Sequence, residues 1–139
     1  MRVLLDTNIL ISYLLVRRDD SPIPAIIEAA VSGSYLLLLP QETVSELSQR
    51  VASKPYLRER IKNDELHQLL AILRPLSEVI PRIARFPAIT RDAKDDYLLA
   101  YAVVGQADYL VTGDRDLLVL EEVQGVRIVT PRVFLSALE

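Results

Sequence analysis

The sequence contains no cysteine, which excludes a disulfide framework, a thiolate metal site and a cysteine nucleophile. Its first residues, MRVLLDTNIL, hold only short apolar runs broken by Asp6, so they match neither a signal peptide nor a membrane span. The formal net charge of −3 also lacks the positive balance that is typical of nucleic-acid binders. A soluble cytoplasmic protein with no membrane partner is therefore expected.

The chain is long enough for one domain with a substantial hydrophobic core, since it has 139 residues. Half of these residues are hydrophobic and a quarter are charged, which is typical of a globular chain rather than a disordered one. No internal repeat, low-complexity tract or long linker divides the sequence. We expect a single domain over residues 1–139.

Short apolar runs that alternate with helical patterns indicate the fold class. The run SYLLLLP, closed by proline, is typical of a strand buried on both faces. Strands that alternate with helices predict an α/β fold, a three-layer α/β/α sandwich with a central parallel sheet. The expected strands are 2–5, 34–40, 76–80, 108–114 and 127–131; the expected helices are 8–16, about 24–32, 41–53, two within 54–74, 95–107 and 132–138; residues 81–94 are expected to be irregular.

Four acidic residues fall where these elements would bring them to one edge of the sheet. Asp6 and Asp114 follow strands, whereas Glu46 and Asp96 lie in the early turns of helices that follow strands or loops. The carboxyl ends of parallel strands meet at one edge, where open α/β sheets bind their ligands. Carboxylates gathered there repel one another unless a cation lies between them, and oxygen ligands of this kind suit Mg²⁺ or Mn²⁺. The pattern therefore predicts a metal site of the type that cleaves phosphodiesters.

Each of these acids also has an ordinary structural interpretation. Asp6 or Thr7 would cap the helix that follows, and Asp114 would cap a turn. Asp96 would complement a helix dipole, and Glu46 would lie on a solvated helix face. Each structural interpretation is favoured when the acid is considered alone. The coincidence of all four at strand ends, or on the helices that leave them, favours the metal site.

The order and spacing of several motifs resemble those of one protein family. The segments are LLDTNILISYLL, PQETVSEL, DAKDDYLLAYAVVGQADYLVTGDRDLL and VRIVTPRVFL. Together they resemble the PIN-domain family, in particular the small prokaryotic VapC-like toxins of toxin–antitoxin pairs. The resemblance covers essentially the whole chain. Its most specific pieces are D-T-N after the first strand and D-x-x-L-A followed by A-D-Y-L-V-T-G-D-x-D-L.

The resemblance implies which residues form the catalytic metal site. Neighbouring acids at Asp92 and Asp95 leave the register of the third ligand open, and Asp96 is preferred because the Leu and Ala of D-x-x-L-A fit from it. The catalytic and metal-binding residues implied are Asp6, Glu46, Asp96 and Asp114.

Three further polar residues accompany these acids in the same motifs. Asn8 of D-T-N is expected to orient Asp6, and Thr112 of T-G-D is expected to hold a carboxylate or a water. Asp116 would either join the metal site or cap the next turn. The sequence leaves these two roles of Asp116 open.

The activity implied by the resemblance is that of a divalent-metal-dependent endoribonuclease that uses Mg²⁺ or Mn²⁺ and needs no histidine as a base. Its substrate would be RNA, and its expected partners are an antitoxin protein and a second copy of the chain in a homodimer. The alternative is a PIN-like module without catalysis that binds RNA or another protein. The presence of all four acids argues against this alternative, because a domain without catalytic activity has no use for a cluster of carboxylates that repel one another.

Basic residues cluster after Glu46, so the negative net charge of the whole chain does not describe this region. Setting aside the four proposed ligands turns the formal charge from −3 into +1. Arg50, Lys54 and Arg58 would suit a groove that binds the RNA backbone. A solvated helix face explains the same cluster equally well.

Overall fold

The apolar runs of the sequence form the buried strands of one sheet. In β1 (Arg2–Leu5) and β2 (Leu36–Pro40) every residue after the first is buried, as the proline-closed run SYLLLLP predicted. The computed structural model describes residues 1–15, 20–83 and 93–139, with the backbone alone for residues 93–96.

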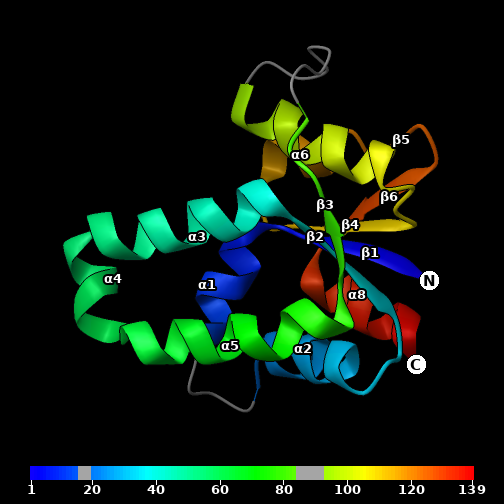
Figure 1. Ribbon diagram of the computed structural model, residues 1–139. Helices are drawn as coiled ribbons and strands as arrows, with labels where there is room; N and C mark the ends of the chain where they lie inside the picture. Colours follow the sequence, from blue (N-terminus) through cyan, green and yellow to red (C-terminus); the bar gives the residue numbers. More distant parts are fainter. Residues whose placement is uncertain (16–19, 84–92) are drawn as a thin grey trace.

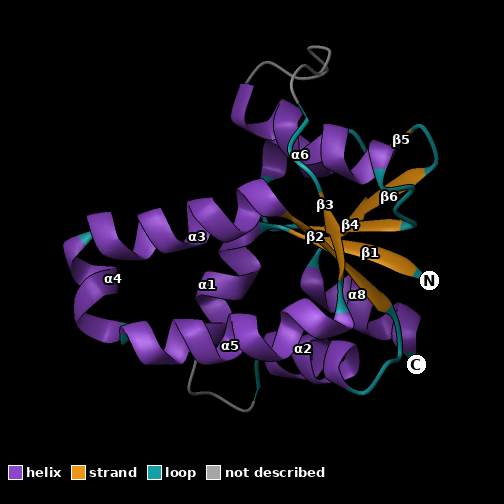
Figure 2. Cartoon of the chain, viewed as in Figure 1, coloured by secondary structure: helices purple, strands orange, loops and turns teal. Residues whose placement is uncertain are grey.

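The remaining elements alternate along the chain largely as predicted (Figure 2). The helix α7 and the strand β5 are additions that the sequence patterns did not indicate. After β1 and β2, the described elements are α1 (Thr7–Leu15), α2 (Ile23–Val31), α3 (Gln41–Ser53), α4 (Pro55–Arg60), α5 (Asn63–Leu76), β3 (Glu78–Ile80), α6 (Ala93–Val104), β4 (Tyr109–Val111), α7 (Arg115–Leu118), β5 (Glu122–Val123), β6 (Val126–Val129) and α8 (Pro131–Leu138).

The strands form one sheet in the order β3-β2-β1-β4-β6-β5. The pairs among the first five strands of this order are parallel, as predicted, but β5 pairs with β6 in the antiparallel direction. The central sheet is parallel as expected, and the antiparallel edge strand β5 is an addition to it. The reason for the antiparallel pairing is a two-residue turn at Gln124 and Gly125, whose φ angles of 48° and 85° suit the tight hairpins that join antiparallel strands.

The sheet reverses its direction of winding between β1 and β4. From β1 the chain proceeds to β2 and β3 on one side, and then returns to β4 on the other side of β1. Such a switch leaves a crevice outside the carboxyl ends of the two central strands, where ligands of α/β proteins bind. Asp6 and residues 112–114 occupy these two ends.

Helices cover both faces of the sheet (Figure 1). Val3 and Leu5 of β1 belong to a core that they share with α1, α2, α3, α4, α5 and α8, whereas Leu4 belongs to a second core with α6 and α7. This alternation follows from the two-residue period of a strand. The predicted three-layer α/β/α architecture is confirmed.

Some sequence predictions fall partly or wholly outside the described residues. Most of the stretch predicted to be irregular, and with it Asp92, lies outside them. Residues 81–83 of that stretch are in neither helix nor strand, and α6 begins two residues earlier than predicted. Within the described ranges, no helix is both long enough and apolar enough to cross a lipid bilayer.

Candidate active site

Asp6 follows β1 directly, and both neighbouring elements fix its position. Its backbone N–H donates to the carbonyl of Val111 on β4 at 2.9 Å, which extends the β1–β4 pairing by one residue. Its Oδ1 accepts from the backbone N–H of Asn8, the second residue of α1, at 3.1 Å. This contact satisfies a free N–H at the start of a helix, as a capping residue does. Asp6 can therefore cap α1 and take part in a polar site at the same time.

Thr112 joins the ends of β1 and β4 through one buried hydroxyl. Its Oγ1 donates to Oδ2 of Asp6 at 2.7 Å and accepts from the backbone N–H of Asp114 at 3.0 Å. Thr112 is 0% exposed, so water does not compete for these contacts. Of the two roles expected for Thr112, the structure contains the contact with a carboxylate.

The negative charge of Asp6 is only partly compensated. Burial raises the pKa of the Asp6 carboxyl above its ordinary value, and the nearby charge of Glu46 acts in the same direction. The hydrogen bonds from Thr112 and Asn8 and the positive charge of Arg50 lower this pKa, but burial prevails. Because ionised Asp6 is costly in this place, a cation bound beside it would be stabilised.

Asp114 caps the short helix α7. Its Oδ1 accepts from the backbone N–H of Asp116 at 2.9 Å, as the capping interpretation requires. The side chain of Asp114 is half-buried beside Thr112, whereas Asp116 is exposed. Asp116 contributes its backbone N–H to this turn.

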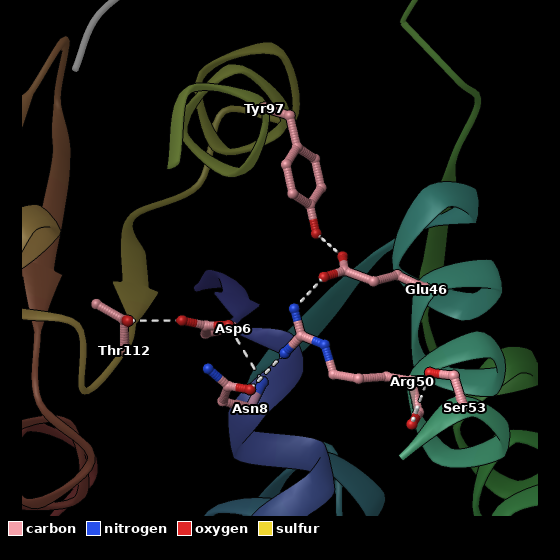
Figure 3. A network of polar contacts seen from close by, with 7 residues as sticks. All are labelled: Asp6, Asn8, Glu46, Arg50, Ser53, Tyr97 and Thr112. Atoms are coloured by element: carbon pink, nitrogen blue, oxygen red, sulfur yellow. Dashed lines mark hydrogen bonds and ion pairs between the residues drawn. The ribbon is translucent and has the colours of Figure 1, made fainter. Parts of the chain in front are cut away.

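Glu46 approaches the same region from α3, with each carboxylate oxygen in a hydrogen bond (Figure 3). Its Oε1 accepts from Nη2 of Arg50, one helical turn later, at 2.5 Å. Its Oε2 accepts from the hydroxyl of Tyr97 on α6. Nη1 of Arg50 in turn donates to Oδ1 of Asn8 at 2.6 Å, so the guanidinium connects α3 with the start of α1. Asn8 therefore contacts Asp6 through its backbone and Arg50 through its side chain.

Tyr97 is a site residue that the sequence reasoning missed. Burial, and then the neighbouring Glu46, raise the pKa of its hydroxyl above the ordinary value, so Tyr97 remains a hydrogen-bond donor at neutral pH. Its only sequence signal is its position directly after Asp96. A tyrosine in a nearly all-apolar helix is more simply interpreted as a core residue.

Thr7 is a second residue without a predicted role beyond capping. It is 1% exposed, and its hydroxyl makes no hydrogen bond of good geometry within the described chain, although it lies close enough to the Tyr97 hydroxyl to lower the pKa of Tyr97. A buried hydroxyl without a partner is costly. The Thr7 oxygen is enclosed by the protein close to the Tyr97 hydroxyl and is not open to a ligand in this structure.

The donor set suits a hard divalent cation, but the described side chains do not by themselves enclose one. Asp6, Glu46 and Asp114 supply carboxylate oxygens, the ligands that Mg²⁺ and Mn²⁺ prefer. Asp96 lies on α6 next to Tyr97, and its side chain is outside the described part of the structure. Among the side chains described, no three acids or histidines lie close enough together to hold a metal ion. Figure 3 shows Arg50 reaching between Glu46 and Asn8.

The three basic residues expected to bind RNA differ in their surroundings. Lys54 and Arg58 are exposed beyond the end of α3. Arg50 lies inside the candidate site through its contacts with Glu46 and Asn8. The exposure of Lys54 and Arg58 fits both a solvated face and a surface that attracts the RNA backbone, whereas Arg50 belongs to the polar network.

A cleft borders Asp114 on the side of α1. Its volume is about 460 Å³, and Asn8 and Asp114 form part of its wall. Ile9, Ile23 and Pro131 also line it, so the cleft combines polar and apolar surface. A ligand of nucleotide size could lie there in contact with the edge that carries Asp114.

The fold and the acids at the carboxyl ends of its strands define an α/β protein with an oxygen-rich site at its topological switch point. Comparison with known proteins identifies the family. The family model described as PIN domain matches residues 2–116. The chain belongs to the PIN-domain family. The resemblance noted in the sequence is thereby confirmed.

A solved structure shares this fold. A chain of the crystal structure of VapBC2 from Rickettsia felis, bound to a DNA fragment from their promoter, matches with a TM-score of 0.61 and 16% sequence identity. The match covers 94% of this chain and 98% of that chain. No curated protein matches the sequence.

Proposed function

We propose that this chain is a divalent-metal-dependent endoribonuclease that hydrolyses RNA phosphodiesters and acts as the toxin of a toxin–antitoxin pair. The observation that carries the proposal is the buried carboxylate of Asp6, held by Thr112 and Asn8 at the switch point of a PIN-domain sheet. The raised pKa of Asp6 indicates that its ionised form is costly in this buried place, and a cation bound beside it would offset that cost. A cation in that place would face the crevice where α/β proteins bind their substrates.

Four acids would hold Mg²⁺ or Mn²⁺ in this proposal. They are Asp6, Glu46, Asp96 and Asp114. When bound, the ion would lower the pKa of a coordinated water and stabilise charge that develops on the scissile phosphate. The role of Asp116 stays open between a further ligand and a turn residue, since its exposed carboxylate is compatible with both.

The other residues of the site orient these acids and receive the RNA. Thr112 and Asn8 fix the rotamer of Asp6, and Tyr97 holds Glu46 from the opposite side of the site. The cleft beside Asn8 and Asp114 provides room for a nucleotide next to the cleaved bond. The exposed Lys54 and Arg58 would contribute attraction for the RNA backbone along α3 and α4.

The partners of the chain also belong to the proposal. An antitoxin partner is supported by the likeness to a chain of VapBC2, which was crystallised with promoter DNA. A homodimer is compatible with large apolar side chains on α4 and α5, since Tyr56 is 53% exposed and Ile72 is 51% exposed. A cytoplasmic location stays a prediction.

One observation favours the non-catalytic alternative, a PIN-like module that binds RNA or another protein. The described side chains do not form a group of three metal-ligating residues. Arg50, which pairs with Glu46, would serve such a module as a permanent counter-charge. The two functions differ in a measurable way, since a module without catalysis should bind Mn²⁺ negligibly.

Cleavage of a labelled single-stranded RNA with Mn²⁺, and with chelator in its place, tests the proposal. The wild type should cleave with Mn²⁺ and stop with chelator. Asp6→Asn should lower the rate by about a hundredfold or more, the scale of losing one electrostatic group from such a site. Asp64→Asn is the matched control, because it makes the same change at an exposed position on α5. Cleavage that is indifferent to chelator, or an Asp6→Asn variant as fast as wild type, would contradict the proposal.

A further inference from the structure

Arg50 has an unusual place for a basic side chain in an acidic site. Its side chain is 29% exposed and that of Glu46 is 28% exposed, so the pair lies half-buried. Both terminal nitrogens are engaged, Nη2 with Oε1 of Glu46 at 2.5 Å and Nη1 with Oδ1 of Asn8 at 2.6 Å. The guanidinium therefore bridges α3 and α1 as a two-pronged donor, a geometry that lysine does not reproduce.

This contact places a positive charge where the proposed metal ion would also act. Arg50 interacts favourably with the charge of Asp6 as well as with Glu46. The hydroxyl of Tyr97 donates to Oε2 of Glu46 and Arg50 donates to Oε1, so both carboxylate oxygens already accept hydrogen bonds. A divalent ion that binds Glu46 must share it with the guanidinium or replace it, and two cations at such short range repel each other.

We propose that Arg50 is a resident cation that competes with the divalent metal for Glu46. This inference rests on the proposed metal-dependent function and assigns Arg50 the role of a positioning residue. Before the metal binds, Arg50 holds Glu46 and compensates the acids. If a divalent ion bound Glu46, the guanidinium of Arg50 would be released and would be available to a phosphate oxygen of the RNA, for which its planar fork is well suited.

A titration of Mn²⁺ binding, without RNA, tests the competition directly. Arg50→Met keeps most of the aliphatic side chain and removes the charge. Because the metal no longer has to displace a half-exposed ion pair, its dissociation constant should fall by about three- to tenfold. Lys54→Met is the matched control, since it removes the same charge from the exposed end of α3 and should change the affinity by less than about twofold.

A conservative variant keeps the test decisive if Arg50→Met does not fold. Arg50→Lys retains the charge but cannot bridge Glu46 and Asn8 at once, so its affinity for Mn²⁺ should lie between those of the wild type and Arg50→Met. If Arg50 has only a structural role, both variants should bind Mn²⁺ more weakly than the wild type. That result would overturn the inference.

The failure of this inference is distinguishable from the failure of the proposed function. If the wild type binds no Mn²⁺, the proposed metal site is wrong and the competition disappears with it. If the wild type binds Mn²⁺ and Arg50→Met binds it equally well or less well, the competition alone is wrong. An equal gain in Arg50→Met and Lys54→Met would mean that only the overall charge matters, which also overturns the inference.

Discussion

The two halves of the candidate site hold their carboxylates by different means. In the strand half, Asp6 is fixed by neutral donors, the hydroxyl of Thr112 and the backbone N–H of Asn8. In the helix half, Glu46 is paired with the charged side chain of Arg50 and with Tyr97. Asp6 is thus positioned without full compensation of its charge, whereas Glu46 carries its own counter-ion. The strand half should depend on a bound metal more strongly than the helix half.

The largest expected effect is the loss of metal-induced stability in the strand half. At a Mn²⁺ concentration of a hundred times the dissociation constant, the wild type should gain about 2.7 kcal/mol in the free energy of unfolding. This corresponds to roughly 10 °C in melting temperature for a domain of this size. Asp6→Asn should lose most of this gain, and Glu46→Gln should lose less, because Glu46 must give up Arg50 to bind the metal. Thermal melts with Mn²⁺ and with EDTA measure both, and a larger loss in Glu46→Gln would break the comparison.

A smaller effect is expected when the strand half loses its hydroxyl. Thr112→Val removes the donor to Asp6 and the acceptor for the N–H of Asp114, so it should cost about 1–2 kcal/mol in the free energy of unfolding. Thr43→Val is a matched control, since Thr43 is also buried, at 1% exposure, and its hydroxyl has no partner among the described residues. The control should be neutral or slightly stabilising. Urea denaturation of both variants in EDTA measures the difference, and equal costs would show that the hydroxyl of Thr112 does not hold Asp6.

The pH dependence of stability should also distinguish the two halves. Because burial raises the pKa of Asp6 in the folded state, folding favours its protonated form. The resulting contribution to stability is present below the ordinary carboxyl pKa of about 3.9 and is lost as the pH rises through the higher pKa of the folded state.

Asp6→Asn removes this titration and keeps a side chain of the same shape. In EDTA, the melting temperature of Asp6→Asn should exceed that of the wild type by a few degrees at pH 7, and the difference should vanish near pH 4. Melting temperatures between pH 4 and pH 7 provide the measurement. A difference that does not change with pH would contradict the assignment of a raised pKa to Asp6.

The smallest effect is expected at Asp114, where a capping role and a metal role coincide. Asn is as good a capping residue as Asp, so Asp114→Asn should preserve the contact with the N–H of Asp116 while it removes a negative charge. Its melting temperature in EDTA should be equal to that of the wild type or about one degree higher, and Mn²⁺ should raise it less. If the variant melts lower in EDTA and keeps the full metal-induced shift, Asp114 is a structural cap alone.

The sequence predicted the strand half of the site better than the helix half. Asp6 and Thr112 lie at the ends of short apolar runs that the sequence predicts as buried strands, and the carboxyl ends of parallel strands meet at one edge of a sheet. The hydrogen bond from Thr112 to Asp6 joins residues that are 106 positions apart. It also requires β1 and β4 to be neighbours, and the sequence did not predict this strand order.

The network around Glu46 could not be predicted in the same way. Its contact with Tyr97 depends on how α6, on one face of the sheet, meets α3, on the other, and no local pattern specifies this meeting. Arg50 showed only a helical spacing from Glu46 that many exposed ion pairs share. The antiparallel strand β5 was missed for a related reason, since Gln-Gly is a weaker turn signal than Asn-Gly or Asp-Gly.

A crystal structure with Mn²⁺, examined for the anomalous scattering of the metal, tests the central claim most directly. The account predicts a peak at the carboxyl ends of β1 and β4, bonded to carboxylate oxygens of Asp6 and Glu46, with the guanidinium of Arg50 withdrawn from Glu46. A crystal that shows no such peak at saturating Mn²⁺, with Arg50 still paired to Glu46, would contradict it.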